Sequence, residues 1–545
     1  MLHALKLATA QCGFNPTKGD PVYRRAITWA GAIGGTVLIL AGCTGSTGEP
    51  GGTSAAPVSG YAGIVAADEP RAATVGREVL AGNGTAVDAA VAMGFAMTAT
   101  LPSRVGLGGG GACVVHKRRG KVQDSVVFLP SKVGEGAAAP GLARGMAALH
   151  ARYGVSQWAG LVRPAERLAA FGHDISRAFR KDLAAGEEKL GQAARSIYLR
   201  DDGSLPAVGD RITQPALGSA LAGLRQRGAG YMTTGSFART LSEGAKDVGQ
   251  PLSVADIRDT VPAFETPISV AFGPHSLLLP PAPVSAGVRT AAAWRGLSGA
   301  ELGAPSSAEW WRALIGASRE TGRATTAGAT KAGPSAGLAV ADRFGNLVAC
   351  GFTLNGLFGT GRIAAGTGVF LAEPQPEAVA GAAILPAIVS NRNTGIGYLA
   401  AHAGPDSAAP AALTQTLALL HGQGGVETQA ARIAKGVQQT GPLRVSTAQE
   451  PRAAAGASSA EARGLGSLLG PARAAAVPGT RVVRHEPGLA DAVRRMLVDE
   501  GYGLDERPGL GRVLLVHCPG GAASDPVGCS AAVDPRGHGM AVRAQ

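Results

Sequence analysis

The chain has 545 residues, of which 45% are hydrophobic and 17% are charged, a balance typical of globular proteins. This composition excludes disorder over the whole length, because disordered chains have few hydrophobic residues and many charges. The formal net charge of +12 raises the question of nucleic-acid binding, but the arginines are scattered and no basic stripe is interleaved with aromatic residues. We therefore expect no nucleic-acid partner, and the positive charge fits an anionic membrane or cell-wall surface better.

The N-terminal region has the pattern of a bacterial lipoprotein signal. Arg24 and Arg25 precede an apolar segment at 26–40, and the sequence LAGC ends at Cys43. Basic residues followed by a short apolar run are typical of a signal segment, and this run is too short and glycine-rich for a membrane-spanning helix. We expect residues 1–43 to be a signal segment in which Cys43 carries a lipid.

Two further features complete this region. A start at Val22 would give the signal an ordinary length, so we expect residues 1–21 to be untranslated. Residues 44–60 are rich in Gly, Ser and Pro with little apolar surface, which indicates a flexible tether. The expected product is a membrane-anchored lipoprotein of the bacterial cell envelope that faces the periplasm.

Downstream, helical blocks alternate with groups of strands. Apolar residues recur at helical spacing over 71–98, but Gly82 and Gly84 interrupt them, so we expect two consecutive helices. Residues 452–479 form a low-complexity Ala/Gly/Ser stretch that we interpret as a surface loop. The other expected elements are a strand pair at 112–115 and 125–128, a helical block at 141–256, and strand-rich regions at 262–281 and 335–404. Helices are expected at 409–435 and 488–500, and a strand at 511–517.

The six cysteines form three groups. Cys12 and Cys43 belong to the leader, Cys113 and Cys350 lie in apolar strand patterns, and Cys518 and Cys529 lie close together near the end. A disulfide between Cys518 and Cys529 fits an oxidising periplasm, and burial of both as free thiols fits the pattern equally well. No cysteine spacing suggests a zinc site.

The most informative segment is a hairpin pattern. Strand patterns at 338–341 and 346–353 flank a turn at 342–345, so a residue at the head of the first strand can lie beside Thr353. Ser335 stands just before the first of these strands.

Residues 338–361, LAVADRFGNLVACGFTLNGLFGTG, resemble the strand pair that follows the self-generated N-terminal nucleophile of γ-glutamyltranspeptidases. Residues 69–111, which end in GLGGGG, are similar to the opening helix and glycine turn of that family. The resemblance runs from about Tyr61 to the C-terminus. It implies an α+β fold, the four-layer αββα sandwich of N-terminal nucleophile (Ntn) hydrolases, and it implies no metal or organic cofactor.

The resemblance also implies a division of the chain and a set of roles. Self-cleavage between Pro334 and Ser335 would give a large-subunit-like part, 61–334, and a small-subunit-like part, 335–545, which contains the insert 452–479. Ser335 would be the nucleophile, and its freed α-amine would act as the base, since the usual amine pKa of about 7.7 to 8 suits proton abstraction. The remaining family positions are Thr353 and Asn355, which hydrogen-bond the nucleophile and the substrate, and Glu377, which holds the substrate's α-ammonium group.

Other positions depart from the family pattern. Where the family has an arginine for the substrate carboxylate this chain has Leu129, and Lys132 is too far along to replace it. The family's paired serines correspond to Ala382 and Ala383, which removes two hydroxyl contacts.

The oxyanion site differs as well. Aligning Pro405 with the family's proline puts Asp406 and Ser407 where two glycines supply backbone donors. A carboxylate on Asp406 would repel an oxyanion, and losing one such donor typically costs a factor of about 10² to 10³ in rate. His402 in the same loop is an alternative donor, although a single histidine is more often structural. The oxyanion residues are therefore left unassigned.

Three functional hypotheses fit these residues. The first is a γ-glutamyltranspeptidase-like enzyme that hydrolyses or transfers γ-glutamyl amides of the glutathione type through Ser335. The second is an inactive homologue that serves as a lipid-anchored structural or binding subunit of an envelope complex. The third is an acylase for another amide, since a retained nucleophile with lost glutamate contacts alters specificity without abolishing the chemistry.

Overall fold

The computed structural model describes residues 60–297, 302, 304, 307–323, 333–422 and 464–545. All of these belong to one compact unit, Ala55–Gln545. The expected signal segment with Cys43, the tether up to residue 59 and residues 452–463 lie outside the described residues. Among the helices of the described ranges, none combines the length and the apolar character that crossing a bilayer requires.

The first main sheet has seven strands, and every pairing in it is antiparallel. Its central hairpin is the one that the sequence predicts. In spatial order the strands are β18 (Met540–Ala544), β1 (Gly63–Ala67), β9 (Ser335–Asp342), β10 (Leu347–Thr353), β2 (Gly110–Lys117), β3 (Val122–Phe128) and β6 (Ala263–Glu265).

The second main sheet has six strands and is also antiparallel throughout. In spatial order they are β17 (Ser530–Val533), β16 (Arg512–His517), β12 (Ile396–Gly404), β11 (Leu385–Asn391), β8 (His275–Leu279) and β7 (Ile268–Phe272). Two small sheets consist of β13 (Ala474–Ala476), β14 (Val482–His485) and β15 (Gly503–Glu506), and of β4 (His173–Asp174) and β5 (Arg211–Ile212).

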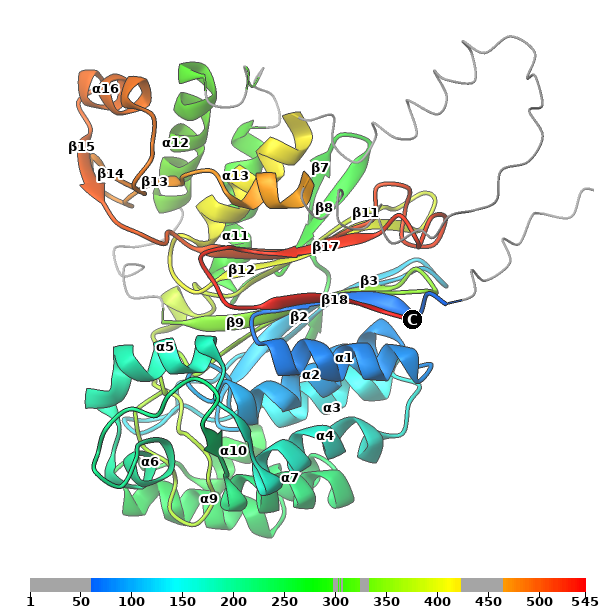
Figure 1. Cartoon of the computed structure of the whole chain (residues 1–545), viewed down its shortest axis with the longest axis vertical. Helices are drawn as coiled ribbons and strands as arrows, with labels where there is room; N and C mark the ends of the chain where they lie inside the picture. The colour runs from blue at the N-terminus through cyan, green and yellow to red at the C-terminus, as the bar shows by residue number, and fades with distance from the viewer. Residues whose placement is uncertain (1–59, 298–301, 303, 305–306, 324–332, 423–463) are drawn as a thin grey trace, which may run out of the picture. The chain divides into compact units, whose positions relative to one another are not determined.

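Helices enclose the two main sheets (Figure 1). On the side of the first sheet lie α1 (Pro70–Ala81), α2 (Ala86–Thr100), α3 (Leu142–Tyr153), α4 (Trp158–Phe171), α5 (Arg177–Gly186), α6 (Gln192–Tyr198), α7 (Pro215–Arg227), α8 (Gly230–Thr233), α9 (Ser236–Asp247) and α10 (Val254–Asp259), with the 3₁₀ turn η1 (Glu187–Lys189). On the side of the second sheet lie α11 (Ser285–Leu297), α12 (Ala308–Arg323), α13 (Ala409–Gly422) and α16 (Asp491–Asp499). A second 3₁₀ turn, η3 (Glu377–Val379), precedes β11.

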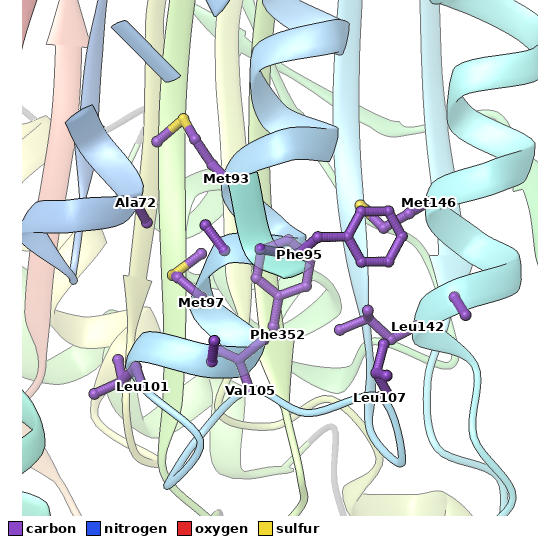
Figure 2. Packing of buried hydrophobic residues seen from close by; sticks show 14 of the residues in the cluster. Ala72, Met93, Phe95, Met97, Leu101, Val105, Leu107, Leu142, Met146 and Phe352 are labelled. Atoms are coloured by element: carbon purple, nitrogen blue, oxygen red, sulfur yellow. The ribbon is translucent and has the colours of Figure 1, made fainter. Parts of the chain in front are cut away.

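Three buried clusters fill the spaces between the layers. One joins the first sheet to its helices, one lies between the two sheets, and one joins the second sheet to its helices. Figure 2 shows part of the first cluster, which includes Met93, Phe95 and Met97 of α2 and Phe352 of β10. Sheets that bury both faces beneath helices form the four-layer αββα architecture, so the expected α+β fold of Ntn hydrolases is confirmed.

The start of α2 shows how local sequence produces this arrangement. Thr85 and Asp88 form a reciprocal capping box, with Asp88 Oδ2 accepting from Thr85 N at 2.9 Å. Asp342, at the end of β9, accepts a hydrogen bond from Ala86 N at 2.9 Å and so ties the helix start to the central strand. Every residue of α2 is buried, which is why its sequence is apolar on all sides.

The structure corrects one expectation and completes another. Interpreting 452–479 as a surface loop is wrong for 464–479, because residues 464–469 are helical, Leu468 and Leu469 are buried, and β13 follows. Leu465, Leu468 and Leu469 of this Ala/Gly-rich stretch pack into the buried cluster that joins the second sheet to its helices. Of the two alternatives for Cys518 and Cys529, the structure has the disulfide.

A second disulfide, Cys113–Cys350, was not expected. Cys113 in β2 and Cys350 in β10 are direct partners across neighbouring strands. The two cysteines are 237 residues apart in sequence, on opposite sides of the bond between Pro334 and Ser335. This disulfide therefore joins the two parts of the chain whether or not that bond is intact.

Candidate active site

Ser335 is the first residue of β9 and lies directly opposite Thr353, the last residue of β10. The expected hairpin is thus confirmed, and it brings these two positions together. Ser335 is fully buried, and its Oγ donates a hydrogen bond of 2.6 Å to the carbonyl oxygen of Ala383. Because the hydroxyl proton is held by that carbonyl, the oxygen's lone pairs point elsewhere and remain free for attack.

The carbonyl of Pro334 already has a hydrogen-bond donor. Thr353 Oγ1 donates to Pro334 O at 3.2 Å and accepts from the backbone N–H of Asn355 at 2.8 Å. The Asn355 N–H occupies a lone pair of the Thr353 hydroxyl, so its proton is directed at the Pro334 carbonyl. A donor fixed on a carbonyl oxygen is the arrangement that stabilises negative charge during nucleophilic attack.

Asn355 shapes the loop that follows β10. Its φ of 64° is in the left-handed region, which asparagine adopts more readily than most residues. The side-chain Nδ2 donates to Glu373 O at 2.8 Å, and the backbone carbonyl accepts from Gln375 Nε2 at 3.0 Å. These bonds hold the Asn355 side chain inside the loop.

Arg104 is a residue that sequence reasoning missed. Its Nη1 donates to the carbonyl of Ser335 at 3.2 Å, while Nε and Nη2 grip the carboxylate of Asp182 at 2.6 and 2.5 Å. Ser103 Oγ donates to the same carboxylate at 2.6 Å. Burial works against the charge of Arg104, but Asp182 outweighs it and the Arg104 pKa is raised. Its position in LPSRVGLGGGG, inside the segment that resembles the family's opening, was the available signal.

Comparison with known proteins relates the N-terminal part of the chain to a known family. The model of the family described as gamma-glutamyltranspeptidase matches residues 72–129 and 122–326. The glutathione hydrolase proenzyme of Bacillus subtilis (strain 168) is 27% identical over 255 residues, covering 42% of this chain and 43% of that protein. Over residues 72–326 this chain is similar to the γ-glutamyltranspeptidase family.

Two further likenesses cover more of the chain. The Escherichia coli (strain K12) glutathione hydrolase proenzyme is 26% identical over 388 residues, 58% of this chain and 66% of that protein. The cephalosporin acylase structure from Bacillus halodurans has a TM-score of 0.68 at 17% identity and covers 91% of this chain and 98% of that one, a likeness of fold. The match thus spans less than half of the B. subtilis protein, and neither range of the family model reaches Ser335.

The site of this γ-glutamyltranspeptidase relative is apolar where the family pattern has its arginine. Leu129 is buried in a small cluster with Val127, Val284 and Ile384. Lys132 is exposed and joins no part of this cluster. A glutamate carboxylate placed beside Leu129 would lie against these apolar side chains, which is unfavourable for a charged group.

The structure does not bring Glu377 into the buried cluster around Ser335. Glu377 is exposed at the start of η3, with no side-chain hydrogen bond or ion pair to another described residue. Glu373 lies closer to the loop of Asn355, but Lys189 forms an ion pair with it. The proposed role of Glu377 toward a substrate ammonium therefore stays a prediction.

The loop after β12 passes directly against the nucleophile. A Cβ on Gly404 would lie 2.3 Å from Ser335 Oγ, so only glycine allows this approach. After Pro405, Asp406 and Ser407 line a cavity of about 170 Å³, and the fully buried Ser335 lies outside its lining. Asp406 Oδ1 accepts from Ala408 N at 2.7 Å, and burial raises the pKa of Asp406.

His402 lies between the two sheets. Its ring fills the space above Gly337 and Gly351, where added Cβ atoms would lie 2.1 and 2.6 Å from ring atoms. Its Nδ1 is 4.0 Å from Asp68 Oδ2, and its buried Nε2 has no hydrogen-bond partner among the described residues. Burial lowers the pKa of His402 to about 4, so the ring is neutral at neutral pH. Within the described ranges, no group of three or more His, Cys, Asp and Glu residues is arranged to hold a metal ion.

Proposed function

We propose that this protein is a self-processing amide hydrolase in which Ser335 is the nucleophile. The observation that carries the proposal is the pair of contacts at the start of β9, where the Ser335 hydroxyl is oriented by Ala383 O and Thr353 Oγ1 donates to Pro334 O. A nucleophile and a donor on the carbonyl that it would attack are the two elements that self-cleavage needs.

The proposed cleavage starts with attack of Ser335 Oγ on the carbonyl carbon of Pro334. The C–O bond forms, the peptide C–N bond breaks, and the hydroxyl proton ends on the Ser335 nitrogen. Water then hydrolyses the ester, which leaves a carboxylate on Pro334 and restores the Ser335 hydroxyl beside a free α-amine. That amine can take the Oγ proton when a substrate amide is attacked, so no histidine is required.

The substrate that fits best is an amide whose acyl group is less polar than a γ-glutamyl group. Leu129 and its apolar neighbours replace the arginine of the family pattern, and Ala382 and Ala383 replace its paired serines. A buried apolar surface rewards apolar contact and penalises an unpaired carboxylate. Among the three hypotheses, this favours the acylase over γ-glutamyl transfer as the present activity.

The inactive homologue is a second candidate because of one specific observation. Ser335 has no exposed surface. Aligning Pro405 with the family's proline would also put Asp406 and Ser407 where the family has its oxyanion glycines. On this view the fold is kept as a binding or structural subunit of an envelope complex.

A denaturing gel of the purified full chain separates the two candidates. Because Cys113–Cys350 spans the cut, a processed chain gives one band without reductant and two bands with it. Ser335→Ala should give a single band under both conditions. A matched control is Ser125→Ala, which removes a buried hydroxyl in the same sheet that has no hydrogen-bond partner among the described residues.

Two outcomes of the gel are decisive. Two reduced bands from the parent and from Ser125→Ala, but one from Ser335→Ala, support the hydrolase. A single reduced band from all three proteins contradicts it and supports the inactive subunit. If cleavage occurs, hydrolysis of apolar N-acyl amides faster than that of γ-glutamyl-p-nitroanilide supports the acylase, and the reverse order contradicts it.

We also propose that the protein is an envelope lipoprotein, on the support of the signal pattern ending at Cys43. Cys43→Ala should move the protein from the membrane fraction to the soluble fraction. A membrane-associated Cys43→Ala protein, or an intact mass without a lipid on the parent, would contradict this proposal.

A further inference from the structure

A partly open cavity lies on the side of the second sheet, next to the loop that touches Ser335. It has a volume of about 170 Å³ and is bounded by α11, α13, the loop 406–408 and residues 474–478. An apolar cavity of about 150 Å³ engineered in another protein holds a benzene molecule, so this space can take a small organic molecule or several waters.

Arg289 of α11 lines this cavity and lacks the carboxylate partner that the buried Arg104 and Arg473 have. Its side chain is 2% exposed, its Nη2 donates to Ala382 O at 3.2 Å, and its Nε has no hydrogen-bond partner among the described residues. No described carboxylate forms an ion pair with it, and burial alone lowers its pKa to about 10. A guanidinium that is still charged at neutral pH is therefore left without an anion, which is costly inside a protein.

Two further polar side chains of the lining are incompletely satisfied. Thr414 and Gln415 of α13 are 3% and 4% exposed. Thr414 Oγ1 and Gln415 Oε1 have no hydrogen-bond partner among the described residues, although Gln415 Nε2 donates to Ala472 O at 2.8 Å. Because that bond fixes the amide orientation, Oε1 is an acceptor that awaits an N–H or O–H group. Buried polar groups are normally paired, so three incomplete ones around one cavity indicate an occupant.

The other charged groups of the lining have partners. The carboxyl of Asp406 accepts from Ala408 N, and Arg484 pairs with Asp505 at 3.3 Å. Burial raises the pKa of Asp406, and the nearby Arg484 and Arg473 act against that shift. Arg289 is then the dominant unpaired charge.

We propose that this cavity binds a small carboxylic acid that also carries an amide N–H or a hydroxyl. The carboxylate lies on the Arg289 guanidinium, and the N–H or O–H group donates to Gln415 Oε1 next to the Thr414 hydroxyl. The site stands one residue from the nucleophile's own partner, because Arg289 holds Ala382 O and Ser335 holds Ala383 O. Its existence does not depend on cleavage at Ser335.

The test is isothermal titration calorimetry of the purified full chain with three probes. N-acetylglycine carries both features, N-acetylglycinamide keeps the shape without the charge, and inorganic phosphate has charge without the amide. We expect N-acetylglycine to bind at least about tenfold more tightly than the other two, since hydrogen bonds between charged groups are stronger than those between neutral groups. Ser335→Ala should bind it as the parent does, which separates this proposal from self-cleavage.

Variants locate the site. Arg289→Met should weaken N-acetylglycine binding at least about tenfold. Thr414→Val, which keeps the side-chain shape, should weaken it by a smaller factor. The matched control is Thr416→Val on the same helix, because Thr416 Oγ1 is engaged with Ala412 O at 2.9 Å and the residue is not part of the lining.

Several outcomes would overturn the proposal. They are no detectable binding of N-acetylglycine, equal binding of the glycinamide or of phosphate, or equal loss in Thr416→Val. If Arg289→Met does not fold, unchanged binding in Thr414→Val overturns the proposal by itself.

Discussion

Two buried arginines flank the start of β9, and they differ in what holds them. Arg104 donates to the carbonyl of Ser335 and is gripped by both oxygens of Asp182. Arg289 donates to Ala382 O, beside the carbonyl that holds the Ser335 hydroxyl, and has no described carboxylate within reach. Arg104 is paired with a carboxylate and helps to position the backbone at Ser335. Arg289 has no carboxylate partner among the described residues, keeps an unpaired Nε donor, and lines a cavity.

The largest expected effect on stability comes from breaking the buried ion pair between Arg104 and Asp182. In Asp182→Asn, Arg104 stays buried without its counter-charge, and breaking a buried pair in this way typically costs about 3–5 kcal/mol. The free energy of unfolding from urea denaturation measures the loss. Glu135→Gln, at an exposed position, serves as the control and should change it by less than about 0.5 kcal/mol. If Asp182→Asn lowers the free energy of unfolding no more than the control does, the stabilising role of the Arg104–Asp182 pair is contradicted.

The second effect is the pH dependence of stability that comes from His402, which is buried and has an unpaired Nε2 among the described residues. Burial lowers the pKa of His402 to about 4, below its usual value of 6.5. Between these values the unfolded chain binds a proton that the folded chain does not, so stability falls as the pH drops through this window and levels off below the folded pKa. The shift corresponds to roughly 3 kcal/mol at most.

The measurement is the free energy of unfolding of the parent and His402→Leu at several pH values from about 7 to 4. We expect a shallower decline in the variant, with the remaining decline due to His116, His173 and His517, whose pKa values burial also lowers to about 4. Parallel curves for the two proteins would show that His402 is not kept neutral by the fold.

The third effect concerns the loop that presses on the nucleophile. In Gly404→Ala, the new methyl group would lie 2.3 Å from Ser335 Oγ and 3.2 Å from Ala383 O, so the hydroxyl must leave its carbonyl. We expect a loss of about 1–3 kcal/mol from overpacking, together with slower appearance of the two fragments on a reducing gel. Gly160→Ala on the exposed face of α4 has open space and should be neutral or stabilising. Cleavage at the parental rate in Gly404→Ala would show that the Ser335–Ala383 bond does not orient the nucleophile.

The sequence predicts features that depend on residues close together in the chain, and it does not predict contacts between residues that are far apart. The break between α1 and α2 and the pairing of Ser335 with Thr353 follow from local patterns, namely Gly82 with Gly84 and the alternation around the turn at 342–345. The two arginine contacts could not be read in this way. Arg104 and Ser335 are 231 residues apart, and only the assembled sheet brings them together.

The same limit applies to the cysteines and to the low-complexity stretch. Cys518 and Cys529 are 11 residues apart, so a disulfide was one of two open alternatives, whereas Cys113 and Cys350 become partners only through the register of β2 and β10. Residues 464–479 have the composition of a loop, but the exposed edge of a hydrophobic cluster gives Leu468 and Leu469 a place to be buried. The composition of a segment does not show which of its residues will be buried by contacts with distant parts of the chain.

The smallest expected effect is the sharpest test of the comparison. Arg289→Met replaces a buried cation that lacks a carboxylate with an apolar chain of similar length, and such replacements are often neutral or stabilising. We expect the free energy of unfolding to stay within about 1 kcal/mol of the parent or to rise, in contrast with the loss from Asp182→Asn. A loss of unfolding free energy as large as that of Asp182→Asn would mean that Arg289 makes stabilising interactions comparable to those of Arg104. An unchanged stability would leave its buried charge to be explained by something that the cavity binds.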